Sequence, residues 1–126
     1  MSNETTAWPI DLSKIAQSDD LHISPLRDDG ITYGTPTWIW SVEVNNELYV
    51  RAYHGQKSSW YKAALKQKVG RILVAATTMD VSFYPETGTV NKLIDEAYRR
   101  KYDGSPYLNS MISERARLAT IRIAPR

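Results

Sequence analysis

The sequence contains no cysteine and only two histidines, His22 and His54. The lack of cysteine excludes disulfides, thiolate metal sites and cysteine nucleophiles, and it suits a reducing compartment. His22 lies within a short alternating segment, which is typical of a structural histidine. Because no His-x-x-x-His pair or cluster of histidine with carboxylates is present, we expect no transition-metal site.

Long apolar runs are missing as well. No stretch approaches the roughly 20 apolar residues that span a bilayer, and the first residues lack the basic and apolar regions of a signal peptide. The 126 residues, 42% hydrophobic and 24% charged, fit one folded domain. We therefore expect a soluble, cytoplasmic protein of bacterial type with a single domain over 1–126, in which residues 1–10 form a flexible segment.

Several motifs of catalysis are absent. The chain has no Gly-x-Ser-x-Gly, no Gly-x-Gly-x-x-Gly and no Walker A sequence, so hydrolase, Rossmann and nucleoside triphosphate chemistry are not supported. Asp28-Asp29-Gly30 lacks the repeated oxygen ligands of a calcium loop and is interpreted as a turn. No catalytic residue is assigned from the sequence.

Acidic residues are missing from one window, Leu48 to Met79, which carries six basic residues, Arg51, Lys57, Lys62, Lys66, Lys68 and Arg71. This asymmetry predicts an electropositive face and an anionic partner. The alternative is a solvated basic helix without a partner. Nucleic acid is disfavoured as that partner, because the net charge is only +2 and no nucleic-acid-binding motif occurs.

Alternation of apolar and polar residues predicts strands over 21–26, 35–44, 47–53, 71–76, 79–84 and 117–124. Within 35–44, the alternation places Trp38, Trp40, Val42 and Val44 on one face. Within 47–53, Leu48 and Val50 oppose Tyr49 and Arg51, and Asn45-Asn46 makes the preceding turn of a hairpin. Helical periodicity predicts helices over 12–17, 59–68, 90–102 and 107–112.

Two helical details can be read from the sequence. Gly70 is expected to end the second helix. In the third helix, the pairs Asp95–Arg99 and Glu96–Arg100 have the i,i+4 spacing of an exposed face.

This order of elements limits the fold. Strands joined mostly by short turns exclude a doubly wound parallel sheet, which needs a helix between successive strands. We therefore expect an α+β, mainly β protein in which an antiparallel barrel of about six strands carries two or three packed helices.

The segment AYHGQKSSWYKAALKQK, over 52–68, joins a strand to the basic helix. A helix N-terminus presents free N–H groups and about half a positive charge, which suits a phosphate. Gly55 would allow close approach of a ligand, and Lys57 and Arg51 would add charge. Ser58 or Ser59 would bond the anion, and Trp60 would flank an aromatic ring. The alternative is that the serines only cap the helix and that Trp60 belongs to the core.

Longer segments carry a resemblance, namely TPTWIWSVEVNNELYVRAYHGQKSSWYKAALKQKVGRI, DVSFYP, IDEAYRRKY and ARLATIRIAPR. Together they resemble a small bacterial family of unknown function, domain-of-unknown-function family 2255, over about 11–126. That family in turn is similar to split β-barrel proteins that bind flavin mononucleotide (FMN) or a deazaflavin cofactor, including the deazaflavin-dependent nitroreductases. The resemblance implies a split β-barrel and an oxidoreductase.

The resemblance also implies a site, in which the loop and helix start contact the cofactor phosphate through Tyr53, His54, Gly55, Lys57, Ser58, Ser59 and Trp60. It further implies a homodimer with the cofactor at the subunit junction. Two features depart from the relatives. Asp28 and Asp29 stand where the relatives have a basic-Ser-Gly turn, and carboxylates there would repel a polyanionic deazaflavin tail. Lys62-Ala63 replaces their usual asparagine. The alternative function is a non-catalytic split-barrel module that binds or interacts without a cofactor.

Overall fold

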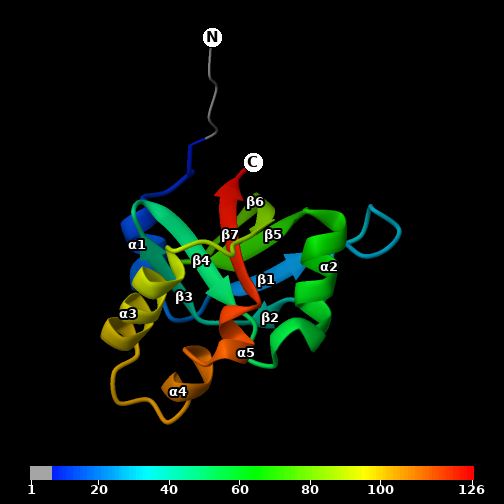
Figure 1. The fold of residues 1–126 in the computed structure, drawn as a ribbon. Coiled ribbons are helices and arrows are strands. Elements are labelled where there is room, and N and C mark those ends of the chain that lie inside the picture. The colour runs from blue at the N-terminus through cyan, green and yellow to red at the C-terminus, as the bar shows by residue number, and fades with distance from the viewer. Residues whose placement is uncertain (1–6) are drawn as a thin grey trace.

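The structure is a computed structural model that describes residues 7–126 (Figure 1). Within these residues one seven-stranded antiparallel sheet has the order β2-β1-β5-β6-β7-β4-β3. Its strands are β1 (His22–Pro25), β2 (Thr37–Trp38), β3 (Ser41–Val44), β4 (Glu47–Arg51), β5 (Val69–Val74), β6 (Thr77–Pro85) and β7 (Thr120–Pro125). The expected mainly β, antiparallel α+β fold is confirmed.

The sheet is curled into a barrel that stays open along one line. β2 and β3 lie at opposite edges of the sheet, yet only Ile39 and Trp40 separate them in the sequence. A link that short spans about 10 Å at most, so the two edges must come close together. The split in the barrel therefore lies at Ile39–Trp40.

The split corrects one predicted strand. The sequence predicted a continuous strand over 35–44, whereas Thr37–Trp38 pairs with β1 and Ser41–Val44 pairs with β4. The chain changes its partner between the two segments, which adds a seventh strand. As a consequence the Trp38 side chain, expected to share a face with Val42 and Val44, is 56% exposed, while those two valines are buried.

Helices cover the sheet from two directions (Figure 1). They are α1 (Leu12–Gln17), the 3-10 turn η1 (Gly55–Lys57), α2 (Ser59–Gln67), α3 (Asn91–Lys101), α4 (Leu108–Met111) and α5 (Glu114–Arg117). Tyr61 and Ala64 of α2 join Leu48 and Val50 in one hydrophobic core. On the other face of the β3–β4 hairpin, Val42 and Tyr49 pack with Ile94 and Tyr98 of α3 in a second core. The predicted opposition of Leu48 and Val50 to Tyr49 and Arg51 is confirmed, and both faces are buried because a helix covers each one.

Several predicted boundaries shift. Lys68, in the left-handed conformation with φ +67°, ends α2. Gly70 lies instead in β5 opposite Pro25, where a Cβ atom would stand 2.6 Å from the Pro25 Cα. The final strand begins at Thr120, because residues 114–117 form α5.

The N-terminal segment is described from residue 7 onward. Residues 1–6 of the segment expected to be flexible lie outside the described residues. Trp8 and Ile10 are partly buried and pack against the core inside the barrel.

A buried arginine joins the sheet to the helices around its outer face. Arg51 is fully buried, and its Nε donates to Thr120 Oγ1 at 3.0 Å. One terminal nitrogen donates to the Asp95 carboxylate and to the Met111 carbonyl, and the other donates to the Asn91 carbonyl and side-chain oxygen. All five N–H groups of the guanidinium therefore have an acceptor, drawn from α3, α4 and β7.

The carboxylate of Asp95 also accepts from Arg117, at 2.9 Å through its second oxygen. The expected Asp95–Arg99 pair on the exposed face of α3 is therefore wrong, since Asp95 is buried and turned toward the sheet. The helix is rotated so that Asn91 and Asp95 share the inner face with Ile94 and Tyr98. The cluster of the buried Arg51 and Asp95 with the partly exposed Arg117 holds two positive charges and one negative charge.

The edge of β3 is closed by α3 rather than by another strand. The Tyr102 hydroxyl accepts from the Ser41 N–H and donates to the Ser41 carbonyl, both at 3.2 Å. The Lys101 ammonium donates to the carbonyls of Ser41 and Ser18, at 2.6 and 2.7 Å. These contacts occupy the backbone N–H and carbonyl of Ser41, at the start of this edge strand.

Replacing Asp95 by Asn should lower the free energy of unfolding by about 3 kcal/mol, because it leaves the buried Arg51 charge without its anion. The control is Glu96→Gln, the neighbouring exposed acid on the same helix, with an expected change below about 0.5 kcal/mol. Urea unfolding followed by tryptophan fluorescence measures both. Equal effects of the two substitutions would contradict the role given to Asp95.

Stability should rise with pH between about 8 and 9.5. Burial lowers the pKa of Lys101 to about 8, below the value of about 10.4 expected for an unfolded chain. In that interval the unfolded chain binds a proton that the folded protein has released, so the unfolding free energy increases with pH. Burial raises the pKa of Tyr102 to about 12, and this opposes stability only above about pH 10, where unfolded tyrosines ionise.

Urea unfolding at pH 7.5, 8.5 and 9.5 measures this rise, and Lys101→Met should flatten it. A variant that keeps the full pH dependence of the wild type would show that Lys101 is not its source.

Candidate functional site

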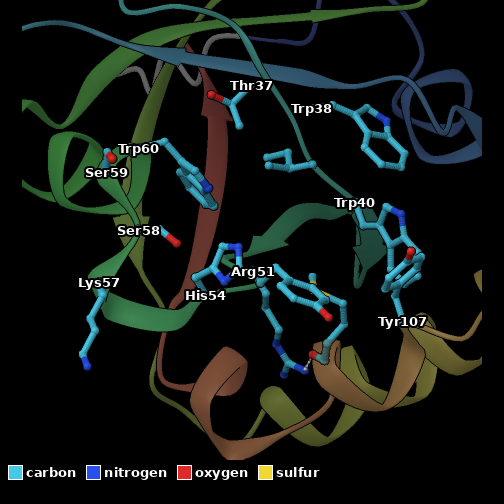
Figure 2. Close-up of a pocket in the computed structure, with 13 residues that line it drawn as sticks. Thr37, Trp38, Trp40, Arg51, His54, Lys57, Ser58, Ser59, Trp60 and Tyr107 are labelled. Atoms are coloured by element: carbon cyan, nitrogen blue, oxygen red, sulfur yellow. Dashed lines mark hydrogen bonds between the residues drawn. The ribbon is translucent and has the colours of Figure 1, made fainter.

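A cavity of about 720 Å³ opens at the split in the barrel (Figure 2). Three parts of the chain form it, namely the β2–β3 connection, the segment from the end of β4 to the start of α2, and the region of α4. Its lining residues are Thr37, Trp38, Ile39, Trp40, Arg51, Tyr53, His54, Lys57, Ser58, Ser59, Trp60, Tyr107 and Met111.

The cavity gathers every site residue named from the sequence except Gly55. Gly55 is buried with φ +74°, and a Cβ atom there would stand 2.6 Å from the Arg115 Cγ. The close approach that this glycine permits is therefore made by Arg115, not by a ligand. Arg115 in turn donates to the Tyr53 carbonyl at 3.0 Å.

Arg51 lines the cavity only with part of its side chain. Figure 2 shows the side chain leaving β4 toward the helices, where its guanidinium meets the Met111 carbonyl. The full set of protein acceptors leaves this guanidinium no N–H for a phosphate. Arg51 was expected to contact a phosphate through its charge. Its guanidinium instead bonds groups of the protein, and the side chain has a structural role in the cavity floor.

The start of α2 offers unused donors to the cavity. Ser58 occupies the N-cap position, yet its side chain makes no capping hydrogen bond. Trp60 lines the cavity and is also partly buried against the core inside the barrel, so the interpretation of Trp60 as a core residue holds in part. The interpretation of Ser58 as a simple side-chain cap does not hold for the structure.

Two basic side chains border this end of the cavity. Lys57 is exposed and forms no ion pair with a described residue, and Figure 2 shows its ammonium extending away from the cavity. His54 is exposed and meets the Tyr53 ring edge-on, with ring centroids 5.1 Å apart. No carboxylate of the described residues lines the cavity.

The acidic turn noted in the sequence lies outside this lining. Asp28 pairs with Lys66 at 3.1 Å. Asp29 accepts hydrogen bonds from the N–H groups of Ile31 and Thr32, which lower the pKa of its carboxyl. Neither acid therefore contributes negative charge to the cavity wall.

The basic window from 48 to 79 does not form a single positive face. Arg51 is buried, Lys66 is paired with Asp28, and Arg71 is paired with Asp80 at 3.2 Å. Lys57, Lys62 and Lys68 remain exposed and form no ion pair with a described residue. The electropositive face expected from the window is thus reduced to three lysines spread along α2 and its ends.

Sequence reasoning missed the wall opposite α2. Trp38, Trp40 and Tyr107 reach the cavity from this side, as Figure 2 shows. The two tryptophans were assigned to one strand face and Tyr107 to a short helix. The only signal available was the density of aromatic residues around 38–40, since the partner change of the strand leaves no mark in the alternation.

Across residues 7–126, every helix is too short or too polar to cross a bilayer. No three histidine or carboxylate side chains gather there as metal ligands would.

Comparison with solved structures identifies a protein that has the same fold. The crystal structure of a "Putative Pyridoxamine 5′-phosphate oxidase" from Listeria innocua matches with a TM-score of 0.61. The match covers 91% of this chain and 88% of that chain at 10% sequence identity, so it shows a shared split-barrel fold. A search of curated proteins finds no match to the sequence.

The family comparison is more direct. The model of a family described as "Uncharacterized protein conserved in bacteria (DUF2255)" matches residues 11–123. This interval includes the whole cavity lining and all seven strands except the end of β7. The chain therefore belongs to the DUF2255 family.

Proposed function

We propose that this protein binds FMN or a deazaflavin in the cavity at the barrel split and acts as an oxidoreductase. The observation that carries the proposal is the convergence of Tyr53, His54, Lys57, Ser58 and Trp60 on one cavity that no described carboxylate lines. Its volume of about 720 Å³ lies within the range of small-molecule and cofactor sites, about 300–1,000 Å³.

The phosphate is assigned to the start of α2. This nine-residue helix carries a partial positive charge at its N-terminus, where backbone N–H groups are free to donate. The Ser58 hydroxyl, which makes no capping bond, supplies a further donor. Lys57 is exposed, and rotation of its flexible stem brings a full positive charge to the anion.

The ring system is assigned to the aromatic part of the cavity. Trp60 stands on one side, with Trp38, Trp40 and Tyr107 on the other (Figure 2). Such surfaces exclude water and stack on planar rings. The fold neighbour from Listeria innocua is named for pyridoxamine 5′-phosphate, a compound that also joins an aromatic ring to a phosphate.

The cofactor, when bound, supplies the electron-transfer chemistry. The residues of this chain hold the phosphate, flank the ring and limit access of water. This division of labour agrees with a cavity whose lining contains neither aspartate nor glutamate and needs no acid–base pair. A homodimer with the cofactor at the junction would also cover Trp38 and Tyr107, which are 56% and 57% exposed.

The proposal is tested on the purified protein by its visible absorbance and by fluorescence titration with FMN and with a deazaflavin. Micromolar or tighter binding of either cofactor is expected. A colourless protein that binds neither would favour the alternative, a split-barrel module that works without a cofactor.

A double substitution, Lys57→Ala with Ser58→Ala, should weaken FMN binding by roughly 2–4 kcal/mol, because it removes one charged and one neutral donor to the phosphate. Thermal stability should change little, since Ser58 makes no capping bond. Lys62→Ala, on the same helix but outside the cavity lining, is the control. Unchanged affinity of the double variant would show that the phosphate does not bind at the start of α2.

A further inference from the structure

One aromatic residue of the cavity wall is held far more firmly than its neighbours. The Trp40 ring stacks on the Tyr102 ring with centroids 3.8 Å apart and planes 2° from parallel. Tyr98 lies beside both, with its ring centroid 6.5 Å from that of Trp40 and 5.9 Å from that of Tyr102. Tyr98 and Tyr102 are both buried, so the three rings form a packed stack behind the cavity wall.

The backbone around Trp40 is fixed by the same two tyrosines. The Tyr98 hydroxyl donates to the Trp40 carbonyl at 3.2 Å. The Tyr102 hydroxyl bonds both the N–H and the carbonyl of Ser41, the next residue. The side chain and the main chain at Trp40 are therefore restrained together, which lowers the entropy that ordering on a ligand would cost.

The other aromatic residues of this wall have weaker support. The Trp38 indole N–H donates to the Asp19 carbonyl at 2.6 Å, and the Tyr53 and Tyr107 rings meet edge-on with centroids 6.1 Å apart. Trp38 and Tyr107 are more than half exposed, and Tyr53 is 38% exposed. Trp40 is only half-buried and lines the cavity while Tyr102 covers one of its faces. The uncovered surface of a rigid indole is thus available on the cavity side.

We infer that Trp40 is the stacking platform of the site, on which a planar aromatic ring of the ligand extends the stack of Tyr98, Tyr102 and Trp40. The inference rests on the proposed function for the identity of the ligand. It adds an orientation, with the ring on Trp40 beside the barrel split and the anionic group at the start of α2. Tyr102 is then a positioning residue, which acts on the ligand only through Trp40.

The test compares Trp40→Leu with Trp38→Leu, a matched change in the same cavity. The probes are FMN, riboflavin, which carries the same ring without phosphate, and 2-naphthol, an uncharged aromatic ring without flavin chemistry. Trp40→Leu should weaken all three at least tenfold, as expected for the loss of one aromatic stack, and should relieve the quenching of bound flavin fluorescence. Trp38→Leu should weaken binding by a smaller factor, because no ring of the described residues stacks behind Trp38.

Two further variants separate stacking from folding. Trp40→Phe retains a smaller ring and should restore part of the affinity and of the quenching. Tyr102→Leu should reproduce the loss of quenching with Trp40 still present, whereas a residue that only stabilises the fold would shift the melting temperature alone.

The outcomes distinguish the flavin proposal from the proposal that Trp40 is the stacking platform. If 2-naphthol binds and depends on Trp40 while neither flavin binds, the flavin proposal fails and the platform stands. If FMN binds with equal affinity to wild type and to Trp40→Leu, the platform fails and the flavin proposal stands. Failure of all three probes to bind the wild type overturns the platform as well.

Discussion

A guanidinium that is removed from water needs an acceptor for each of its five N–H groups, and this requirement organises the architecture around Arg51. Its acceptors come from Asn91 and Asp95 on α3, from the Met111 carbonyl in α4 and from Thr120 on β7. Because a buried charge without partners costs several kcal/mol, these elements must stay in one arrangement. The β-sheet and the helices on its outer face are thereby tied at a single point.

That point also lies beneath the cavity. Arg51 and Met111 both line the cavity floor, so the hydrogen bond that anchors α4 fixes one side of the site as well. The wall above comes from the split in the barrel, where Trp40 is held by Tyr98 and Tyr102. The remaining side is the start of α2, whose donors are left unused by the protein. Structural contacts thus hold two sides of the cavity, while on the third side the Ser58 side chain makes no capping hydrogen bond.

Local features of this protein were predictable from the sequence, and long-range ones were not. The β3–β4 hairpin followed from alternation and from Asn45-Asn46, and the start of α2 followed from Ser58-Ser59 and the periodicity after it. The break at Ile39–Trp40 could not be seen, because an extended chain that changes its partner strand keeps the same alternation. Asp95 was assigned to Arg99 since that pair is close in sequence, whereas its partner Arg51 lies 44 residues away. The site residues at 53–60 were found together because they are contiguous, while the opposite wall depends on the closure of the barrel.

The central claim is that a phosphate-bearing aromatic cofactor spans the cavity from the start of α2 to Trp40. NMR titration of the labelled protein with FMN tests it most directly. The account predicts shifts of the backbone amides of Ser58, Ser59 and Trp60 together with the indole N–H of Trp40, and no shift of the indole N–H of Trp8, which lies outside the cavity lining. Shifts confined to the exposed lysines of α2, or no shifts at millimolar FMN, would contradict it.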